Sequence, residues 1–198
     1  AHICSRLDGM PLAIELAAAR LNALSLSDIA ARLDDRFTLL SGGRRGALAR
    51  HQTLRALIDW SHDLLSEPEQ AVFRRLSVFM GGWSLEQAGT VTELDPLPVL
   101  TQLIAKSLVV MEENDGQTRY RFLETIRQYA LEKLAGQGEV ERARRLHALA
   151  FTQLAEQAWS FLHGHEQMRW IKRLRLEQPN LRAALDWSLS PGGDPLLG

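Results

Sequence analysis

The chain has 198 residues, of which 45% are hydrophobic and 24% charged, and its formal net charge is −1. This composition is typical of a globular protein with one large domain or two to three small ones, and the near-zero charge excludes a global field that would hold nucleic acid or an anionic membrane. One cysteine, Cys4, excludes an intramolecular disulfide framework and suits a reducing cytoplasm, where we expect the protein to reside. No apolar run reaches the roughly 18 residues of a membrane span, so we expect no membrane partner.

The N-terminal segment, 1–47, has the pattern of a small helical domain. A Gly-Met-Pro turn leads into an almost wholly apolar run, and Pro11 suits the first turn of a helix because its missing N–H is not needed there. A second helix is expected from near Ser27, which can cap it. The stretch "SGGRRGALAR" at 41–50 predicts a linker because three glycines interrupt the pattern. A solvated linker is favoured over a phosphate contact for its arginines, and its hinge candidates are Gly42, Gly43, Arg44 and Arg45.

The middle segment, 48–136, has the element order of a winged helix-turn-helix domain. Apolar residues at helical spacing predict helices in "HQTLRALIDWSHDLL", "SEPEQAVFRRLSVF", "LEQAGTV" and "PLPVLTQLIAKSL". Ser66 with Glu69, and Ser84, are expected to cap the second and third of these helices. The extended runs "SLVVMEE" and "TRYRFLE", joined by "NDGQ", predict a β-hairpin. A closing helix is expected in "TIRQYALEKLA", ending at Gly136.

The C-terminal segment, 137–198, is helical again. "EVERARRLHALAFTQLAEQAWSFL" predicts one long amphipathic helix, and "EQMRWIKRLRLEQ" and "PNLRAALDWSL" predict a pair of helices divided before Pro179. Helix pairs after a globular domain are typical of helical-repeat arrays. The expected fold is therefore mainly α: a small helical domain, a winged helix with one β-hairpin, and the start of antiparallel helical-repeat hairpins similar to tetratricopeptide repeats.

No residue pattern in the chain predicts catalysis. The phosphate-binding signature G-x-x-x-x-G-K-[ST] does not occur, so we expect no nucleotide hydrolysis by this chain and assign no catalytic residue. Asp59 and His62 stand one helical turn apart and are interpreted as a surface pair rather than part of a triad. His163 and His165 lack a cysteine or a paired carboxylate nearby, which favours an exposed loop over a metal site, so no metal ligand is assigned.

A winged helix typically binds DNA through the helix before its hairpin. Here that helix, "PLPVLTQLIAKSL", offers only Gln102 and Lys106, and residues 85–113 carry five acids against one base. Because affinity for DNA depends on cations that release counterions from phosphates, we expect no direct DNA binding by this domain. Arg119 and Arg121 on the hairpin do not change that expectation. A winged helix that serves as a packing module is favoured.

The C-terminal segment carries a cluster of four cations: Arg169, Lys172, Arg173 and Arg175. The first three share one face of the predicted helix. A solvated face is the ordinary interpretation of such a run, and a partner-binding surface is the alternative. We expect protein partners to bind through the helical-repeat region.

Five blocks of the sequence, in order, resemble the bacterial STAND-class signalling ATPases, whose nucleotide-binding module is related to NB-ARC. The blocks are "CSRLDGMPLAIELAAARL", "RLDDRFTLLSGG", "RHQTLRALIDWSHDLLSEPEQAVFRRLSVFMGGWSLEQA", "YRFLETIRQYALEKL" and "NLRAALDWSL". The family is common among actinobacterial transcriptional regulators of the SARP and LuxR types. The resemblance implies a parent with a P-loop ATPase core, a small helical domain, a winged helix and tetratricopeptide-like repeats. Residues 1–47 would then end the nucleotide-binding module, and a chain without an initiator Met fits a middle piece of such a parent.

The resemblance also implies where ADP or ATP would bind. The Gly-Met-Pro turn matches the family's G-x-P motif, whose proline packs near the adenine, and this assigns an adenine wall to Gly9, Pro11 and Leu12. Leu123 and Glu124 stand where relatives carry a Met-His-Asp motif that reaches the ADP β-phosphate, although leucine donates no hydrogen bond. The P-loop and its Mg²⁺ would belong upstream of this chain, so we expect the chain alone to bind nucleotide weakly or not at all.

The sequence leaves three functions open. The leading hypothesis is the regulatory middle of a STAND-type ATPase switch in signal transduction and transcription, which holds ADP- and ATP-dependent closed and open states and relays them to partners. The first alternative is a DNA-binding winged-helix transcriptional regulator. The second alternative is a helical-repeat interaction scaffold that works without nucleotide.

Overall fold

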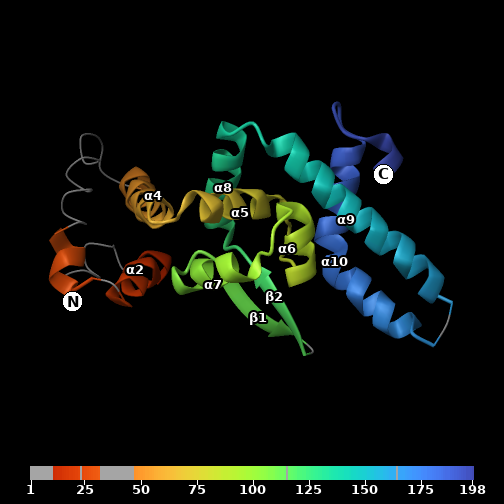
Figure 1. Cartoon of the computed structure of the whole chain (residues 1–198), viewed down its shortest axis with the longest axis horizontal. Helices are drawn as coiled ribbons and strands as arrows, with labels where there is room; N and C mark the ends of the chain where they lie inside the picture. Colours follow the sequence, from red (N-terminus) through yellow and green to blue (C-terminus); the bar gives the residue numbers. More distant parts are fainter. Residues whose placement is uncertain (1–10, 23, 32–46, 115, 164) are drawn as a thin grey trace.

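The structure is a computed structural model that describes residues 11–22, 24–31, 47–114, 116–163 and 165–198. The described chain is mainly helical, with one two-stranded antiparallel sheet (Figure 1). None of the helices in these ranges combines the length and the apolar character that crossing a membrane requires. Several predicted site positions lie outside the described residues, namely the side chain of Leu12 and the whole of Gly9, Gly42, Gly43, Arg44 and Arg45.

The elements form a short N-terminal helical part, a middle domain with the β-hairpin, and a C-terminal pair of long helices. They are α2 (Pro11–Ala18), η1 (Ala19–Asn22), a helix over 26–31, α4 (Ala47–Asp63), α5 (Glu67–Arg75), η2 (Leu76–Val78), α6 (Leu85–Thr92), α7 (Leu97–Ala105), β1 (Val110–Asn114), β2 (Gln117–Arg121), α8 (Glu124–Gly136), α9 (Val140–Phe161), α10 (Gln167–Ser188) and η3 (Pro195–Leu197). Figure 1 shows the N-terminal helices and the long C-terminal helices on opposite sides of the middle domain.

The N-terminal part follows the predicted pattern with two corrections. α2 begins at Pro11, as predicted, and packs against α4. The cap of the next helix is Ser25 rather than Ser27, because Ser25 Oγ accepts a hydrogen bond from the backbone N–H of Asp28 at 3.2 Å. The predicted linker at 41–50 is too long, since its last four residues, "ALAR", already belong to α4. Alanine, leucine and arginine all favour helix once the glycines end.

The predicted caps within the middle domain are confirmed. Glu69 accepts a hydrogen bond from the backbone N–H of Ser66 at 2.6 Å, at the start of α5. Ser84 Oγ accepts one from the backbone N–H of Gln87 at 3.2 Å, at the start of α6. Glu93 then adopts a left-handed conformation with φ 58°, which ends α6 and turns the chain toward α7. The predicted winged helix is therefore formed by α5, α6 and α7 followed by β1, β2 and α8, and the hairpin is its wing.

A backbone bridge that the sequence did not predict extends the wing. β1 and β2 pair antiparallel from Val110 opposite Arg121 to the turn. Beside β2, Trp83 and Tyr120 exchange backbone hydrogen bonds of 2.8 and 2.9 Å. Gly82 permits this close approach, because its φ is +116° and a Cβ there would lie 2.8 Å from the carbonyl oxygen of Tyr120. The loop before α6 is thereby fixed against the wing.

One hydrophobic core runs from the winged helix into the C-terminal helices. Phe79 stacks on Trp83 with ring centres 5.3 Å apart and meets Phe151 of α9 at 6.2 Å. Trp83 also contacts the edge of Phe122 at 5.0 Å. All four rings are buried. Separation of the winged helix from α9 would expose this aromatic surface to water, which is unfavourable.

α9 and α10 pack along each other as a helical hairpin, as predicted. The predicted division before Pro179 is wrong, because α10 continues through this residue without a break. A proline inside a helix removes one intrahelical hydrogen bond, here the one to the carbonyl of Arg175, which lies in an exposed turn. The proline ring instead lies beside Gly81, where an added Cβ would be 3.3 Å from Pro179 Cγ. Packing against α9 and the winged helix therefore outweighs the lost hydrogen bond.

Candidate functional site

The face that a winged helix would present to DNA carries little available positive charge. α7 exposes Leu97, Thr101 and Gln102. Lys106, directly after α7, lies 3.5 Å from Glu69 and donates a hydrogen bond to Gln102 Oε1 at 3.3 Å. A phosphate would have to compete with both partners. This helix therefore lacks the unpaired cations that hold a DNA backbone.

The two arginines of the wing are paired with carboxylates as well. Arg121 Nε donates a hydrogen bond to Glu112 Oε1 at 2.7 Å, across the hairpin. Arg119 is buried and forms an ion pair with Glu177 of α10. The wing thus uses its described arginines for contacts within the protein.

A buried polar cluster joins the wing and α6 to the C-terminal helices. We call it the junction cluster and define it by its members Gln87, Arg119, His147, Glu177 and Asn180, all of which are buried. Glu177 lies at its centre. Its carboxylate accepts hydrogen bonds at 2.5 and 3.2 Å from Arg119, at 2.9 Å from Gln87 and at 2.9 Å from Asn180. A carboxylate that fills its acceptor positions in this way, opposite a guanidinium, is held firmly in place.

Asn180 completes the junction cluster with hydrogen bonds to the loop before α6. Its Nδ2 donates to the carbonyl of Gly82 at 2.9 Å, and its Oδ1 accepts from the backbone N–H of Met80 at 2.7 Å. His147 Nε2 lies 3.3 Å from the same Oδ1. Because Asn180 Oδ1 can only accept, the neutral imidazole carries its proton on Nε2. One side chain of α10 therefore fixes both this loop and the ring of His147.

Burial and hydrogen bonding set the charge states of two members of the junction cluster. Burial lowers the pKa of His147 to about 4, so the ring is neutral at pH 7. Burial alone would raise the pKa of Glu177, but the hydrogen bonds and charge of Arg119, with the bonds from Asn180 and Gln87, keep that pKa below its ordinary value. At neutral pH the cluster is thus a carboxylate opposite a guanidinium, beside a neutral imidazole.

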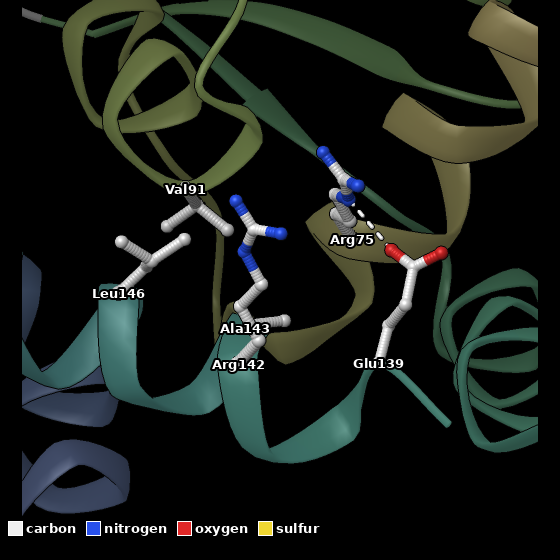
Figure 2. A pocket seen from close by; sticks show the side chains of 6 residues that line it. All are labelled: Arg75, Val91, Glu139, Arg142, Ala143 and Leu146. Carbon is white, nitrogen blue, oxygen red and sulfur yellow. Dashed lines mark hydrogen bonds and ion pairs between the residues drawn. The ribbon is translucent and has the colours of Figure 1, made fainter. Parts of the chain in front are cut away.

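A second contact attaches the start of α9 to the winged helix. Glu139 accepts hydrogen bonds from Arg74 Nη2 and Arg75 Nε, each at 2.7 Å. Arg75 also donates to the carbonyl of Thr92 at 3.0 Å. Figure 2 shows Arg75 and Glu139 near side chains of α6 and α9, namely Val91, Arg142, Ala143 and Leu146. The space between these side chains is too small for a water molecule, so this contact is a structural tie rather than a ligand site.

The residues assigned to nucleotide binding lie at the starts of two separate helices. Pro11 is exposed at the start of α2, which packs on α4, whereas Leu123 and Glu124 begin α8, which packs on α5. Leu123 packs against the core, and hydrogen bonds of 2.8 and 2.9 Å from Arg127 lower the pKa of Glu124. An aliphatic side chain and a carboxylate donate no hydrogen bond to a phosphate, so these side chains do not fit the diphosphate contact. The adenine wall stays a prediction.

Asp59 and His62 are not the surface pair that the sequence predicts. His62 is buried, with its ring centre 5.8 Å from that of Phe73 and 5.7 Å from that of Tyr129, because this side of α4 faces α5 and α8. Asp59 accepts a hydrogen bond from the Tyr129 hydroxyl at 2.6 Å, and burial together with this bond raises the pKa of the phenol. Both residues thus contribute to packing. Among the described residues, no group of three or more His, Cys, Asp and Glu side chains is arranged so that it could hold a metal ion.

The chain shares sequence with transcriptional regulators. Residues 65–135 match the family of winged helix-turn-helix domains. The chain is 50% identical over 197 residues to a protein of Mycobacterium tuberculosis (strain ATCC 25618 / H37Rv) that is named provisionally as an HTH-type transcriptional regulator, and to one of the same description in Mycobacterium bovis. Each of these matches covers 96% of this chain and 22% of the relative. An uncharacterised M. tuberculosis protein is 49% identical over 147 residues, which is 71% of this chain and 37% of the relative. No solved structure matches.

These similarities support a winged-helix protein related to transcriptional regulators better than they support a STAND-type ATPase. The supported function is the first alternative drawn from the sequence. The chain spans about a fifth of the length of the regulators it matches, 22% of each. The helix-turn-helix in their names therefore need not be the winged helix described above.

The junction cluster is the part of the site that the sequence did not reveal. Trp170, Glu177 and Ala184 are spaced seven residues apart, so they lie on one side of α10, and all three are buried. A glutamate in an apolar stripe is a signal of a buried ion pair, since a buried charge needs a partner. The stripe does not reveal that the partner is Arg119 on the wing.

Proposed function

We propose that this chain is a regulatory part of a winged-helix transcriptional regulator in which the winged helix connects the N-terminal helices to the α9–α10 hairpin instead of reading DNA. One observation carries the proposal: Arg119, a cation that a DNA-binding wing would offer to phosphates, is buried on Glu177 of α10. The similarity to transcriptional regulators supports the biological setting. In this proposal, another part of the longer protein contacts DNA.

The attachments of α6 explain how the winged helix would transmit a movement of the hairpin. Gln87 in the first turn of α6 donates to Glu177 of α10, and Glu93 at the end of α6 pairs with Arg142 of α9. α6 is thus held at both ends by the two long helices. A shift of the hairpin must either carry α6 with it or separate Gln87 from Glu177, and a hydrogen bond to a charged group contributes about 1.5–3 kcal/mol. These contacts therefore favour movement of the winged helix and the hairpin as one unit.

Fluorescence anisotropy with the 198-residue chain and 20-base-pair duplexes of random sequence, at 50 and 200 mM salt, tests the proposal. We expect only non-specific binding, with dissociation constants weaker than about 1 μM at 200 mM salt. The double variant Gln102→Ala/Lys106→Ala should bind like the parent. Nanomolar binding with a steep salt dependence that this variant abolishes would overturn the proposal.

A winged helix that reads DNA is the second candidate, and the match of residues 65–135 to winged helix-turn-helix domains favours it. This candidate requires Arg119 to leave Glu177 and face a phosphate. Glu177→Gln keeps the size of the side chain and removes the charge that holds Arg119. Under the second candidate the variant should bind the duplexes at least tenfold more tightly, whereas under the first its affinity should be unchanged.

A finer proposal concerns the longer protein and rests on the resemblance to STAND-type ATPases. In it, ADP and ATP with Mg²⁺ set closed and open states, and Pro11 contributes to the adenine wall. The test is the ADP affinity of the longer protein with Pro11→Asp, with Pro11→Ala as the control. A tenfold loss of affinity confined to Pro11→Asp would support this proposal. Unchanged affinity and unchanged basal activity in both variants would contradict it.

A further inference from the structure

An open groove of about 980 Å³ lies between the tip of the wing and the N-terminal half of α10. Gln117 lines it from β2, and residues between Met168 and Leu176 line it from α10. Gln117 stands two residues before Arg119, so both side chains project from the same face of the strand. Since Arg119 meets Glu177, the groove begins where the junction cluster ends.

The α10 side of the groove carries four cations, Arg169, Lys172, Arg173 and Arg175, against one carboxylate among the described residues that line it, Glu166. Arg169 and Glu166 pair loosely at 3.4 Å, and both side chains are exposed. Arg173 lies over the ring of Trp170, 5.1 Å from its centre. Lys172, Arg173 and Arg175 form no ion pair with a described residue. Their positive charge is therefore available to a ligand.

The same groove exposes apolar side chains beside the cations. Met168 is 66% exposed and Leu176 is 42% exposed, one before and one after the run of cations. If this face of α10 contacted only solvent, these two apolar side chains would bury no surface and would contribute no stability. Nucleic acid would use the cations and leave the two apolar side chains uncovered, because its backbone offers phosphates and sugars. An acidic peptide with apolar side chains matches both features, and arginine, methionine and tryptophan are enriched where proteins bind one another.

We propose that this groove binds an acidic segment of a partner protein, whose carboxylates pair with Lys172, Arg173 and Arg175 and whose apolar side chains cover Met168 and Leu176. The two apolar residues are eight positions apart on α10, or about 12 Å along the helix axis. A partner helix of two to three turns spans that distance. The groove contains no member of the junction cluster, so its occupancy does not depend on the proposed role of the winged helix.

The test measures binding of a fluorescein-labelled 14-residue peptide, made of glutamate with leucine at every third or fourth position, to the 198-residue chain by anisotropy. Lys172→Glu/Arg173→Glu should weaken binding at least tenfold. The matched control is Arg144→Glu/Arg182→Glu, which makes the same charge change at exposed residues outside the groove and should stay within twofold of the parent. Equal losses in both variants would mean a general charge attraction and would overturn the proposal. Circular dichroism melting checks that each variant folds.

A second pair of measurements separates a peptide from nucleic acid. Met168→Ser/Leu176→Ser should weaken peptide binding at least threefold, and a peptide with glutamine in place of glutamate should bind at least tenfold more weakly. A 20-base-pair duplex is the competing probe. If the duplex binds more tightly than the peptide and Lys172→Glu/Arg173→Glu abolishes that binding, the groove binds nucleic acid and the proposal is wrong.

Discussion

The wing and α10 both carry basic side chains, and the structure uses them in opposite ways. Arg119 and Arg121 on the wing are each paired with a carboxylate, one buried and one partly exposed. Lys172 and Arg173 on α10 lie exposed, without an ion pair to a described residue. The two regions look alike in a count of charges, yet only α10 offers its cations to a ligand. In a chain whose net charge is near zero, packing decides which surface can attract an anion.

The largest expected effect concerns the buried pair of the wing. Glu177→Ala leaves Arg119 buried without its carboxylate, and removal of one partner of such a pair costs roughly 3–5 kcal/mol. We expect the free energy of unfolding, measured by urea denaturation, to fall by about that amount. Glu166→Ala is the control, because Glu166 is half exposed in its ion pair with Arg169 and such surface pairs contribute less than about 1 kcal/mol. Equal small losses of unfolding free energy in the two variants would contradict the difference between a buried ion pair on the wing and an exposed one on α10.

The second effect is a pH dependence of stability that arises in the junction cluster. The pKa of His147 is lowered to about 4, so between pH 6.5 and about 4 the unfolded chain binds more protons than the folded one. Stability from this residue is fully present above pH 6.5 and decreases as the pH falls through that window, by on the order of 3 kcal/mol. Glu177, whose pKa is also lowered, adds a further loss at more acidic pH.

Urea denaturation at a series of pH values measures this dependence. His147→Gln keeps a hydrogen-bond donor for Asn180 and cannot titrate, so its stability should vary less between pH 6.5 and 4 than that of the parent. Parallel curves for the parent and His147→Gln would contradict the burial of a neutral histidine in the cluster.

A smaller effect is expected at the loop that holds the wing in place. Gly82→Ala puts a Cβ 2.8 Å from the carbonyl oxygen of Tyr120 at a φ of +116°, and such strain costs about 2 kcal/mol. Gly116→Ala is the control, since its φ is +74° but no atom lies within 4 Å of the added Cβ. Thermal melting should show the larger decrease for Gly82→Ala. The reverse order would mean that the loop does not pack on β2.

The smallest effect distinguishes the two arginines of the wing from each other. Arg121 and Glu112 are 36% and 42% exposed, so their ion pair is screened by water and contributes less than about 1 kcal/mol. Arg121→Ala should therefore lower the free energy of unfolding by less than that, and Arg119→Ala by several times more. Similar values for the two variants, by urea denaturation, would contradict the assignment of Arg119 as the buried attachment to α10.

Features that depend on near neighbours in the chain were predictable from the sequence. Ser66 and Ser84 cap their helices through residues three positions away, and the polar turn between the two extended runs is a local hairpin signal. The order of helices and hairpin followed from such signals, and the family of residues 65–135 agrees with it. The common face of Arg169, Lys172 and Arg173 also followed from helical spacing alone.

Features that depend on distant residues needed the tertiary structure. The charges of Arg119 and Arg121 were visible in the sequence, but the pairing of Arg119 with a glutamate 58 positions later was not. Helical packing carried α10 through Pro179, where a local rule predicts an end. The helices and hairpin of the winged helix, the caps of α5 and α6, and the excess of acids over bases in residues 85–113 could all be predicted from the sequence, since short-range hydrogen bonds, side-chain periodicity and composition set them. The tertiary structure alone decided which cations are buried and which face solvent, because burial depends on what packs against a residue from elsewhere in the chain.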